Sequence, residues 1–540
     1  MFNNNQQQSA IDHGKGNRMP ASIAAVLAAA AMGIVLHALY GHSWNETSGH
    51  AIGSDDAYIS YRYALNFFKG AGLVFNPGEY VEGYSNFLYV LLVTPALLVS
   101  QDFIYPFSMA LNILLFMIAA LLFHGFLSRS LGRRMAIAGT ALLAINPFIW
   151  ANAATGLETM LVLVSILLAW ILAERYLRTE SRRDLHLLIA ALVLSILCRI
   201  DGFLLPMLVV VYLAAKSKYR AALACFAGIL ISMGLYTLWR LYYYDDIIGN
   251  TYYAKVSGPL LDRFRSGLTY FMQNMPRGAL WVYFAAIAAA VFGLLRRPAA
   301  LFQKLNFAIL YCTAWLAYLL YIGGDIYFER FFIGIYPMGI FLLLSACATL
   351  RMPPQMAKAL LGVLLFLQLI PVVQDGRFSY ASQRYDGWKT LGEHLRKHHP
   401  GQTLAIDAAG KVPYFSNLTT IDMLGLNDKT IGKKKIDTGS FHAGHNKFDP
   451  QYVLSKKPDL IAAWILPSLD MAWGLTHNVI RDAYTVRYLV NLSRDDRGER
   501  NIIDVSGLPD ESIKKLIASG YGYAVLGRKT AHGQAGNGRP

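Results

Sequence analysis

The chain has 540 residues, of which 55% are hydrophobic and 15% are charged. Its mean hydropathy of +0.36 is unusual for a soluble protein, and apolar runs long enough to cross a bilayer recur along it. The formal net charge of +15 could indicate a nucleic-acid partner. The basic residues instead follow the pattern of membrane loops, so we expect no nucleic acid.

The N-terminal end consists of a polar tail and then an apolar run. Residues 1–19 are rich in Asn and Gln and predict a disordered cytoplasmic tail. The run at residues 21–40 is too long for the core of a signal peptide and has no clear cleavage site. It therefore predicts a retained membrane anchor.

Apolar run lengths predict about eleven membrane helices within residues 20–374. They are expected to begin near residues 20, 106, 133, 157, 185, 203, 221, 279, 305, 330 and 357. The apolar segment 84–99 is interpreted as re-entrant or interfacial, because counting it as a full span would scatter the Lys and Arg clusters over both faces. With this choice the basic loops share the cytoplasmic side.

The opposite, outer side then receives the unusual polar clusters. The first outer loop covers about residues 42–100, and further polar clusters stand at residues 152–158, 199–202, 245–255 and 323–330. The chemistry of the protein is therefore expected to face the periplasm or the cell exterior.

The composition changes near residue 374, where polar residues become frequent and apolar runs shorten. Residues 386–398 and 511–519 predict helices, and residues 404–407, 459–464 and 521–526 predict short strands. This pattern indicates a periplasmic α/β domain over residues 375–528, followed by a disordered tail at 529–540.

Two adjacent carboxylates, Asp55 and Asp56, follow the first apolar run after a short polar gap. If this segment is helical, Asp55, Tyr58 and Arg62 share one face. A carboxylate there could take a proton from a sugar hydroxyl, and the arginine could hold a phosphate. A solvated loop with an ordinary helix-start aspartate explains the same residues. Glu82, at the end of the same loop, is a second candidate for the catalytic carboxylate.

Two further outer clusters combine charges with aromatic or amide groups. Arg199 and Asp201 stand between short apolar segments, where charges face a cavity or pair with each other. A helical-hairpin turn with a local ion pair is the alternative. Tyr252 and Tyr253 could pack against a sugar ring, and Lys255 could bind a phosphate. An interfacial aromatic belt is an alternative for these three residues.

The last outer cluster ends with Asp325 and Arg330, which fit a phosphate head group at the mouth of a helix or simply pair with each other. The glycines at residues 70–78 lack the strand-to-helix context and the Lys-Ser/Thr ending of a nucleotide-binding loop. We therefore expect no nucleotide cofactor and no nucleotide-sugar donor. No metal-ligand spacing is recognisable, so no metal is expected.

Several of these segments together resemble membrane glycosyltransferases of the GT-C fold, in particular the mycobacterial terminal arabinofuranosyltransferase and its bacterial relatives. The segments are DDAYISYRYA (55–64), GLVFNPGE (72–79), VEGY (81–84), GLET (156–159), NTYYAK (250–255), GGD (323–325) and IDMLGLND (421–428). The resemblance spans roughly residues 20–465. The family often has Thr where this chain has Ser85 and an Arg-Pro-Glu-like turn at residues 199–201, which leaves the donor-site role of Asp201 in doubt.

The resemblance implies an enzyme of the bacterial inner membrane with its active site facing the periplasm. It implies a polyprenyl-phosphate-linked sugar as donor, with arabinofuranose as the sugar, and a glycan or protein hydroxyl as acceptor. It assigns the catalytic carboxylate to Asp55 foremost, with Asp56 as its neighbour. The residues it places around the donor are Tyr58, Arg62, Glu158, Arg199, Asp201, Asn250, Tyr252, Tyr253, Lys255, Asp325 and Arg330.

Three other functions share these features. A protein O-glycosyltransferase and a lipopolysaccharide-modifying enzyme of the same fold would carry the same segments. A lipid-sugar transporter would also have broken helices and charges near the membrane. The transporter is disfavoured because the acids stand at the outer ends of helices and no inverted repeat is visible.

Overall fold

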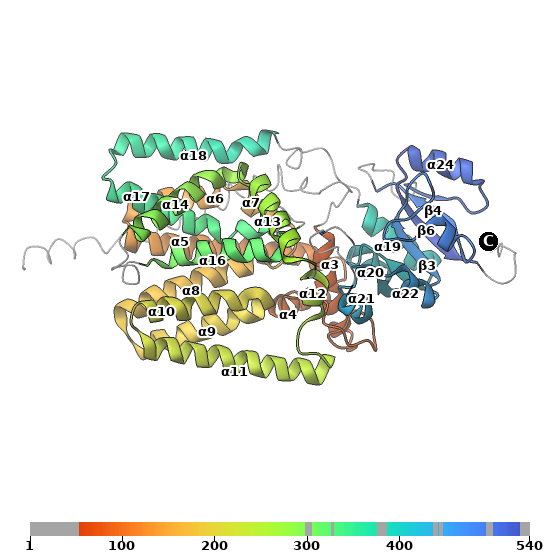
Figure 1. The fold of residues 1–540 in the computed structure, drawn as a ribbon, viewed down its shortest axis with the longest axis horizontal. Coiled ribbons are helices and arrows are strands. Elements are labelled where there is room, and N and C mark those ends of the chain that lie inside the picture. The colour runs from red at the N-terminus through yellow and green to blue at the C-terminus, as the bar shows by residue number, and fades with distance from the viewer. Residues whose placement is uncertain are drawn as a thin grey trace, which may run out of the picture.

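The computed structural model describes residues 53–256, 258–296, 305–325, 329–374, 386–435, 441, 447–492 and 501–529, without the side chains of residues 200, 201, 278 and 371–374. The expected N-terminal tail and anchor, and the tail beyond residue 529, lie outside the described residues. A long helical bundle carries a smaller sheet domain at one end (Figure 1).

Long apolar helices form the body of the bundle. Within the described ranges, α5 (Ile104–Ser130), α8 (Thr159–Thr179) and α11 (Tyr219–Tyr244) are long and apolar enough to cross a membrane. Helices α6 (Arg133–Ala144) and α7 (Pro147–Ala154) form a fourth candidate span that bends by 50°. The bend follows from Asn146, which caps α7, and from Pro147 in its first turn.

The remaining bundle helices are shorter than the roughly 20 residues that a full span needs. They are α9 (Arg182–Cys198), α10 (Leu204–Ala215), α14 (Leu280–Leu295), α16 (Phe307–Ile322) and α17 (Ile335–Thr349), while α18 (Pro354–Gln374) has an apolar stretch of the same kind within it. Each helix expected after the anchor has a counterpart among these elements. The protein is thus a mostly helical membrane protein with several candidate spans, and the count of eleven stays a prediction.

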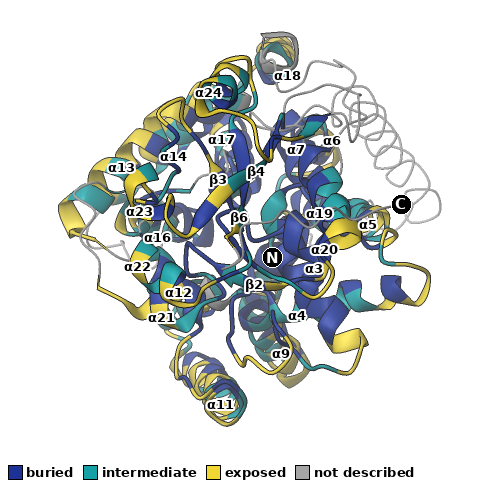
Figure 2. Cartoon of the chain, turned by 90° about the vertical axis from the view of Figure 1, so that its right-hand side faces the viewer, coloured by how far each residue is buried: buried dark blue, intermediate teal, exposed yellow. Residues whose placement is uncertain are grey.

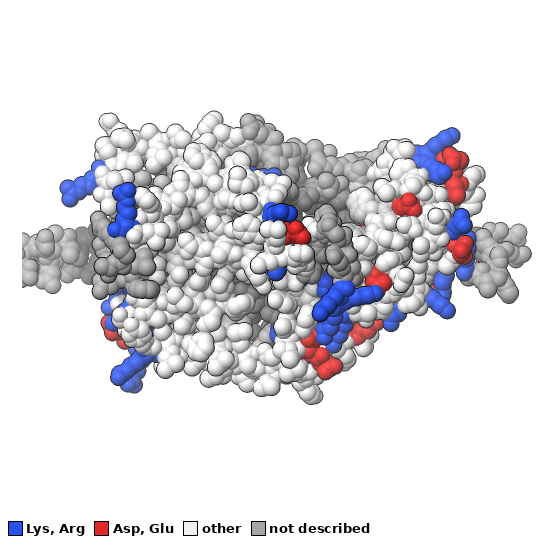
Figure 3. All heavy atoms as spheres, in the orientation of Figure 1, with Lys and Arg blue, Asp and Glu red and all other residues white. Residues whose placement is uncertain are grey.

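The surface of the bundle is consistent with a lipid environment. Figure 3 shows a broad face of the bundle almost without charged side chains, with Lys and Arg gathered at its end away from the sheet domain. The junctions α8–α9, α10–α11 and α17–α18 lie at that end (Figure 1). Apolar side chains such as Leu223 and Leu230 on α11 are exposed, as expected where lipid replaces water.

Short helices occupy the end of the bundle beside the sheet domain, which is the end predicted to face outward. They include α3 (Asp55–Phe68), α4 (Phe87–Val93), the 3-10 turns η2 (Thr94–Leu98), η3 (Ile200–Phe203), η4 (Arg277–Ala279) and η6 (Arg330–Phe332), and α12 (Asn250–Lys255). Segment 84–99 is therefore two short helical pieces, and its re-entrant or interfacial placement stays a prediction. The amphipathic helix α13 (Leu260–Asn274) was not predicted.

The C-terminal domain is built on a six-stranded mixed sheet in the order β2-β1-β3-β6-β4-β5. Strands β1 (Thr403–Ile406), β2 (Thr419–Asp422) and β3 (Leu460–Trp464) are parallel, and β6 (Tyr523–Arg528) runs antiparallel to β3 and β4 (Tyr484–Val490). Strand β5 (Ile502–Asp504) pairs with β4. The accompanying helices are α19 (Gly387–His398), α20 (Lys411–Ser416), α21 (Lys429–Lys433), α22 (Pro450–Ser455), α23 (His477–Ile480) and α24 (Asp510–Ala518).

The bundle and the sheet domain share one apolar core at their junction. The main core of the bundle continues through Ala409, Tyr414 and Phe415 of the sheet domain, and two other clusters cover the faces of the sheet. Figure 2 shows α3 and α20 largely buried near the centre, while α11 lies at the rim. The junction therefore holds the first outer loop between the two parts of the molecule.

Candidate functional site

Helix α3 places the two adjacent aspartates at its first turn, where carboxylates interact favourably with the helix dipole. Residues Ala57 to Asn66 of this helix are all buried, because the bundle packs on one side of α3 and α20 packs on the other. Successive helical residues point about 100° apart, so Asp55 and Asp56 face different surroundings.

Asp55 contacts the sheet domain. Its carboxylate accepts hydrogen bonds from the backbone N–H groups of Gly410 (3.0 Å) and Lys411 (2.7 Å) at the start of α20. Burial of the carboxyl group, countered by these hydrogen bonds, raises the pKa of Asp55 to about 7. Both carboxylate oxygens of Asp55 therefore already accept hydrogen bonds from the backbone.

Asp56 lies in a different environment. Its side chain is half-buried, and no hydrogen-bond donor in the described part of the chain contacts its carboxylate. Burial acts to lower the pKa of Arg330, but the nearby carboxylates of Asp325, Glu158 and Asp56 hold that pKa above its usual value. Asp56 thus lies within electrostatic range of the Arg330 guanidinium and keeps its oxygens available.

Arg330 begins η6, just after the positive-φ turn that follows α16. Its guanidinium donates from Nε and Nη2 to Asp325 Oδ2, at 2.7 and 2.6 Å. Gly323 and Gly324, which precede Asp325, both have positive φ, and a Cβ at Gly324 would clash with the Tyr270 ring. Only glycine allows this tight turn, which fixes the direction of the Asp325–Arg330 pair.

A second ion pair stands opposite Arg330. Arg199, at the end of α9, donates from Nη1 to Glu158 Oε1 at 2.5 Å. Asn86 donates to the other Glu158 oxygen at 2.7 Å, and Ser60 of α3 donates to Asn86 Oδ1 at 3.0 Å. Burial would raise the pKa of Glu158, but the guanidinium groups of Arg199 and Arg330 hold it below its ordinary value. This chain of contacts connects the helix that carries the aspartates to Arg199.

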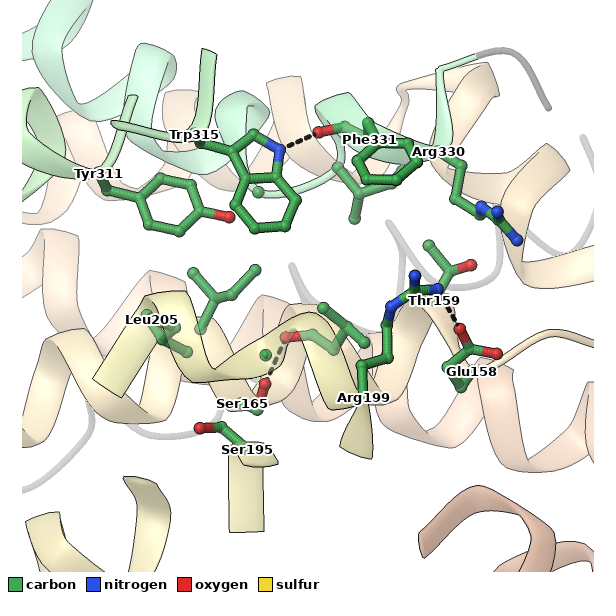
Figure 4. A pocket seen from close by; sticks show the side chains of 15 residues that line it. Glu158, Thr159, Ser165, Ser195, Arg199, Leu205, Tyr311, Trp315, Arg330 and Phe331 are labelled. Atoms are coloured by element: carbon green, nitrogen blue, oxygen red, sulfur yellow. Dashed lines mark hydrogen bonds and ion pairs between the residues drawn. The ribbon is translucent and has the colours of Figure 1, made fainter. Parts of the chain in front are cut away.

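A pocket lies between these two ion pairs and continues among apolar side chains. One end holds Glu158, Arg199, Arg330 and Thr159, and the other runs past Tyr311 and further apolar residues of α8, α10, α16 and η6 (Figure 4). The space between these side chains that no atom fills is about 620 Å³, part of it open to the outside. The pocket is charged at one end and apolar at the other.

Two features of the pocket wall were not predicted from the sequence. Trp315 stacks on Tyr311 with ring centroids 5.7 Å apart, and its Nε1 donates to the Phe331 carbonyl at 2.6 Å. Thr159 is 5% exposed, and its hydroxyl has no hydrogen-bond partner among the described residues. A buried hydroxyl without a partner is costly, so its place in the pocket indicates a ligand contact.

The structure does not bring Glu82 and Arg62 to this pocket. Glu82 forms a buried ion pair with Arg240 of α11 and accepts a hydrogen bond from Tyr236 at 2.9 Å. Arg62 donates to the carbonyls of Phe75 (2.7 Å), Leu418 (2.6 Å) and Pro413. In this conformation both residues connect structural elements, and their catalytic and donor-binding roles stay predictions.

The other expected donor residues also lie at the junction with the sheet domain. Tyr58 packs edge-on against Tyr414, with ring centroids 5.2 Å apart. Asn250 donates from Nδ2 to the carbonyls of Gly425 (2.8 Å) and Leu426 (2.9 Å) in the segment that follows β2. The two segments NTYYAK and IDMLGLND therefore meet in space, and their donor-binding role stays a prediction.

The remaining predicted residues stand at the edge of this region. Tyr253 donates to Asp246 Oδ1 at 3.2 Å, Tyr252 is exposed and Lys255 is half-buried. The side chain of Asp201 lies outside the described residues. Across the described ranges, no three His, Cys, Asp or Glu side chains lie close enough together to hold a metal ion.

The sequence comparison and the structure comparisons cover different extents of the chain. A family model described as Domain of unknown function (DUF8728) matches residues 377–494, which is less than half of the chain. No curated protein matches the chain in sequence. ArnT from Cupriavidus metallidurans, in its crystal structure bound to undecaprenyl phosphate, is 12% identical with a TM-score of 0.56, over 94% of this chain and 98% of ArnT.

Two structures of the Archaeoglobus fulgidus oligosaccharyltransferase are also similar. The structure tethered to an acceptor peptide containing the NVT sequon is 12% identical with a TM-score of 0.51, over 87% of this chain and 73% of that protein. The complex with Zn and sulfate is 13% identical with a TM-score of 0.49 over 74% of this chain, which spans 62% of that protein's length. The similarity along nearly the whole of ArnT shows that this chain has a fold of the GT-C glycosyltransferase type.

Proposed function

We propose that the protein is a membrane glycosyltransferase that moves a sugar from a polyprenyl-phosphate donor to a hydroxyl acceptor on the outer side of the membrane. The observation that carries this proposal is the pocket with two arginines at one end and an apolar wall behind them. A polyprenyl phosphate has the same division, because an anionic head is attached to a long hydrocarbon tail. Arginine pairs well with phosphate oxygens, and apolar side chains accept the isoprene units.

The reaction assigns different tasks to the groups around the pocket. The bond between the anomeric carbon and the phosphate oxygen breaks, and a bond forms between that carbon and the acceptor hydroxyl oxygen. Asp56 accepts the hydroxyl proton, and the polyprenyl phosphate leaves as an anion. Arg199 and Arg330 stabilise the negative charge that grows on the leaving phosphate. Atoms and charge balance without a cofactor.

Two further observations support this proposal. ArnT, whose fold this chain shares, was crystallised with undecaprenyl phosphate, and the oligosaccharyltransferase was captured with an acceptor peptide. The half-buried Asp56 carboxylate has no donor partner in the described structure and lies within electrostatic range of Arg330. The resemblance of the outer-loop segments supports arabinofuranose as the sugar and a glycan or protein hydroxyl as the acceptor.

The test is a transfer assay with the purified full-length protein in detergent. Synthetic polyprenyl-phosphoryl arabinofuranose and the corresponding lipid-linked hexoses serve as donors, with oligosaccharides and peptides as acceptors, and mass spectrometry detects the product. Transfer from the furanose donor supports the whole proposal. Transfer from the lipid-linked hexoses alone would support the proposed reaction and would contradict arabinofuranose as the sugar. Binding of polyprenyl phosphate without any sugar transfer would contradict the proposed glycosyltransferase activity and favour a transporter.

The Thr159 hydroxyl provides a sensitive test of the pocket. We expect Thr159→Val to raise the KM for the donor roughly 3- to 10-fold, the loss of about one hydrogen bond. The same change should leave thermal stability unchanged or slightly higher, because it removes a buried hydroxyl without a partner. Ser165→Ala is the matched control, because that hydroxyl already donates to the Val162 carbonyl. An unchanged KM for the donor in Thr159→Val would show that Thr159 does not bind the donor.

A further inference from the structure

The first outer loop and the sheet domain are joined by polar contacts that are far apart in sequence. Gln101 and Tyr414 form a reciprocal pair: Gln101 Nε2 donates to the Tyr414 carbonyl and the Tyr414 hydroxyl donates to the Gln101 carbonyl, both at 2.8 Å. Asn76 pairs in the same manner with the backbone of Thr420 in β2, at 2.8 and 3.0 Å. These contacts, with those of Arg62 and Asn250, fix one orientation of the domain on the loop.

Asp55 lies at the centre of this junction. The Asp55 carboxylate accepts both backbone donors at the start of α20, so that the first turns of α3 and α20 are joined. A Cβ at Gly410 would overlap the carbonyl oxygen of Asp55, which leaves room only for glycine. The next side chain, Lys411, is fully buried and pairs with Asp386 at 2.7 Å. The contact between α3 and α20 is thus closely packed, both at Asp55 and at the start of α20.

We propose that docking of the sheet domain on Asp55 sets the position of Asp56, so that Asp55 is a positioning residue and the sheet domain is a working part of the active site. This inference rests on the proposed function above. Asp56 is adjacent to Asp55 in the same helical turn, so a rotation of α3 moves both carboxylates together. A displacement of about 1 Å at a reacting group can cost two orders of magnitude in rate.

Variants on the two sides of the contact test the proposal in the full-length protein. Asp55→Ala and Gly410→Ala should each lower kcat by about 10- to 100-fold and leave the KM for the donor within about twofold, because the pocket arginines are untouched. The double variant should be no slower than the slower single variant, since both changes break the same contact. Gly522→Ala is the control in the same domain, because a Cβ there meets nothing closer than Trp464 at 3.9 Å.

Amide hydrogen exchange tests the contact between Asp55 and Gly410 without any substrate. Gly410→Ala should raise amide exchange in α3 at least tenfold and leave α8 unchanged, whereas Gly522→Ala should alter neither helix. If the wild-type protein transfers no sugar, the proposed function fails and the exchange of α3 still tests the docking. A KM increase in Asp55→Ala as large as its loss of kcat, or a fully active Gly410→Ala, would overturn the positioning role.

A pH profile separates this role from simple structural support. The ionised Asp55 carboxylate accepts both N–H groups, so kcat should rise with pH through about 7, the pKa of Asp55, and this limb should disappear in Asp55→Asn. The charged groups that face Asp55 are Asp56 on α3 and Lys411 on α20, the latter paired with Asp386. Because the folded pKa lies above the ordinary value of 3.8, thermal stability should fall as pH rises from about 4 to 7. An unchanged kcat profile in Asp55→Asn would contradict the proposal.

Discussion

Asp56→Asn should lower kcat for sugar transfer by about 10²- to 10⁴-fold, the usual contribution of a general base. The asparagine keeps the shape of the side chain and removes only its ability to take the proton of the acceptor hydroxyl. The KM for the donor should change little, because Arg199 and Arg330 remain in place. Single-turnover kinetics with the lipid-linked donor would measure both quantities.

This result would also distinguish the two aspartates. Asp56→Asn should remove the chemical step, whereas Asp55→Asn should remove the rise of kcat near pH 7 and retain a slow reaction. Asp482→Asn is a suitable control, because this side chain is 91% exposed on the sheet domain. A properly folded Asp56→Asn variant with full turnover would show that Asp56 is not the base.

Arg330→Gln should lower kcat by about 10²- to 10³-fold, as when a donor to a developing anion is removed. This substitution alone would remove the ion pair that Arg330 forms with the Asp325 carboxylate and should destabilise the fold. The double variant Arg330→Gln/Asp325→Asn removes both charges and should recover most of this stability. We expect it to remain as inactive as the single variant, because the phosphate would still lack its cation.

The matched control for this experiment is another ion pair at the outer end of the bundle. Arg277 donates to the buried Glu329 at 3.1 Å, and neither residue lines the pocket. The variant Arg277→Gln/Glu329→Gln also removes both charges of its pair, so it should keep most of its stability and also its turnover per folded molecule. Binding of polyprenyl phosphate, followed by intrinsic fluorescence, should weaken in the Arg330 variants and persist in this control. Wild-type turnover in the Arg330 double variant would exclude a phosphate role for Arg330.

Local patterns predicted the elements of the fold better than their assembly. Uniformly apolar runs indicated the bundle helices, and short apolar runs between polar residues indicated β1, β3 and β6. Helix α13 was missed because it mixes Arg263 and Arg265 with apolar residues and forms no apolar run. The pairing of β1 with both β2 and β3 depends on contacts between distant segments, which no local pattern records.

The candidate site shows the same limit. The ion pair between Arg199 and Glu158 joins residues 41 positions apart in two different helices, so the sequence indicated both charges and not their partnership. The family resemblance assigned the catalytic carboxylate to Asp55 foremost, and only the position of α20 shows that Asp55 and Asp56 have different surroundings. Gly410 must be glycine because of a contact with Asp55, which lies 355 residues earlier in the chain.

The hydrogen bonds of Arg62 have a consequence for the order of biosynthesis. Its buried guanidinium depends on carbonyls of Pro413 and Leu418, which are made 351 and 356 residues later. At 5–20 residues per second the ribosome needs roughly 20–70 s to reach them. During that interval α3 lacks these two carbonyl partners. If the positioning role of Asp55 holds, a nascent or truncated chain can insert its helices and present its pocket, yet it acquires activity only when its last domain has been made and has folded.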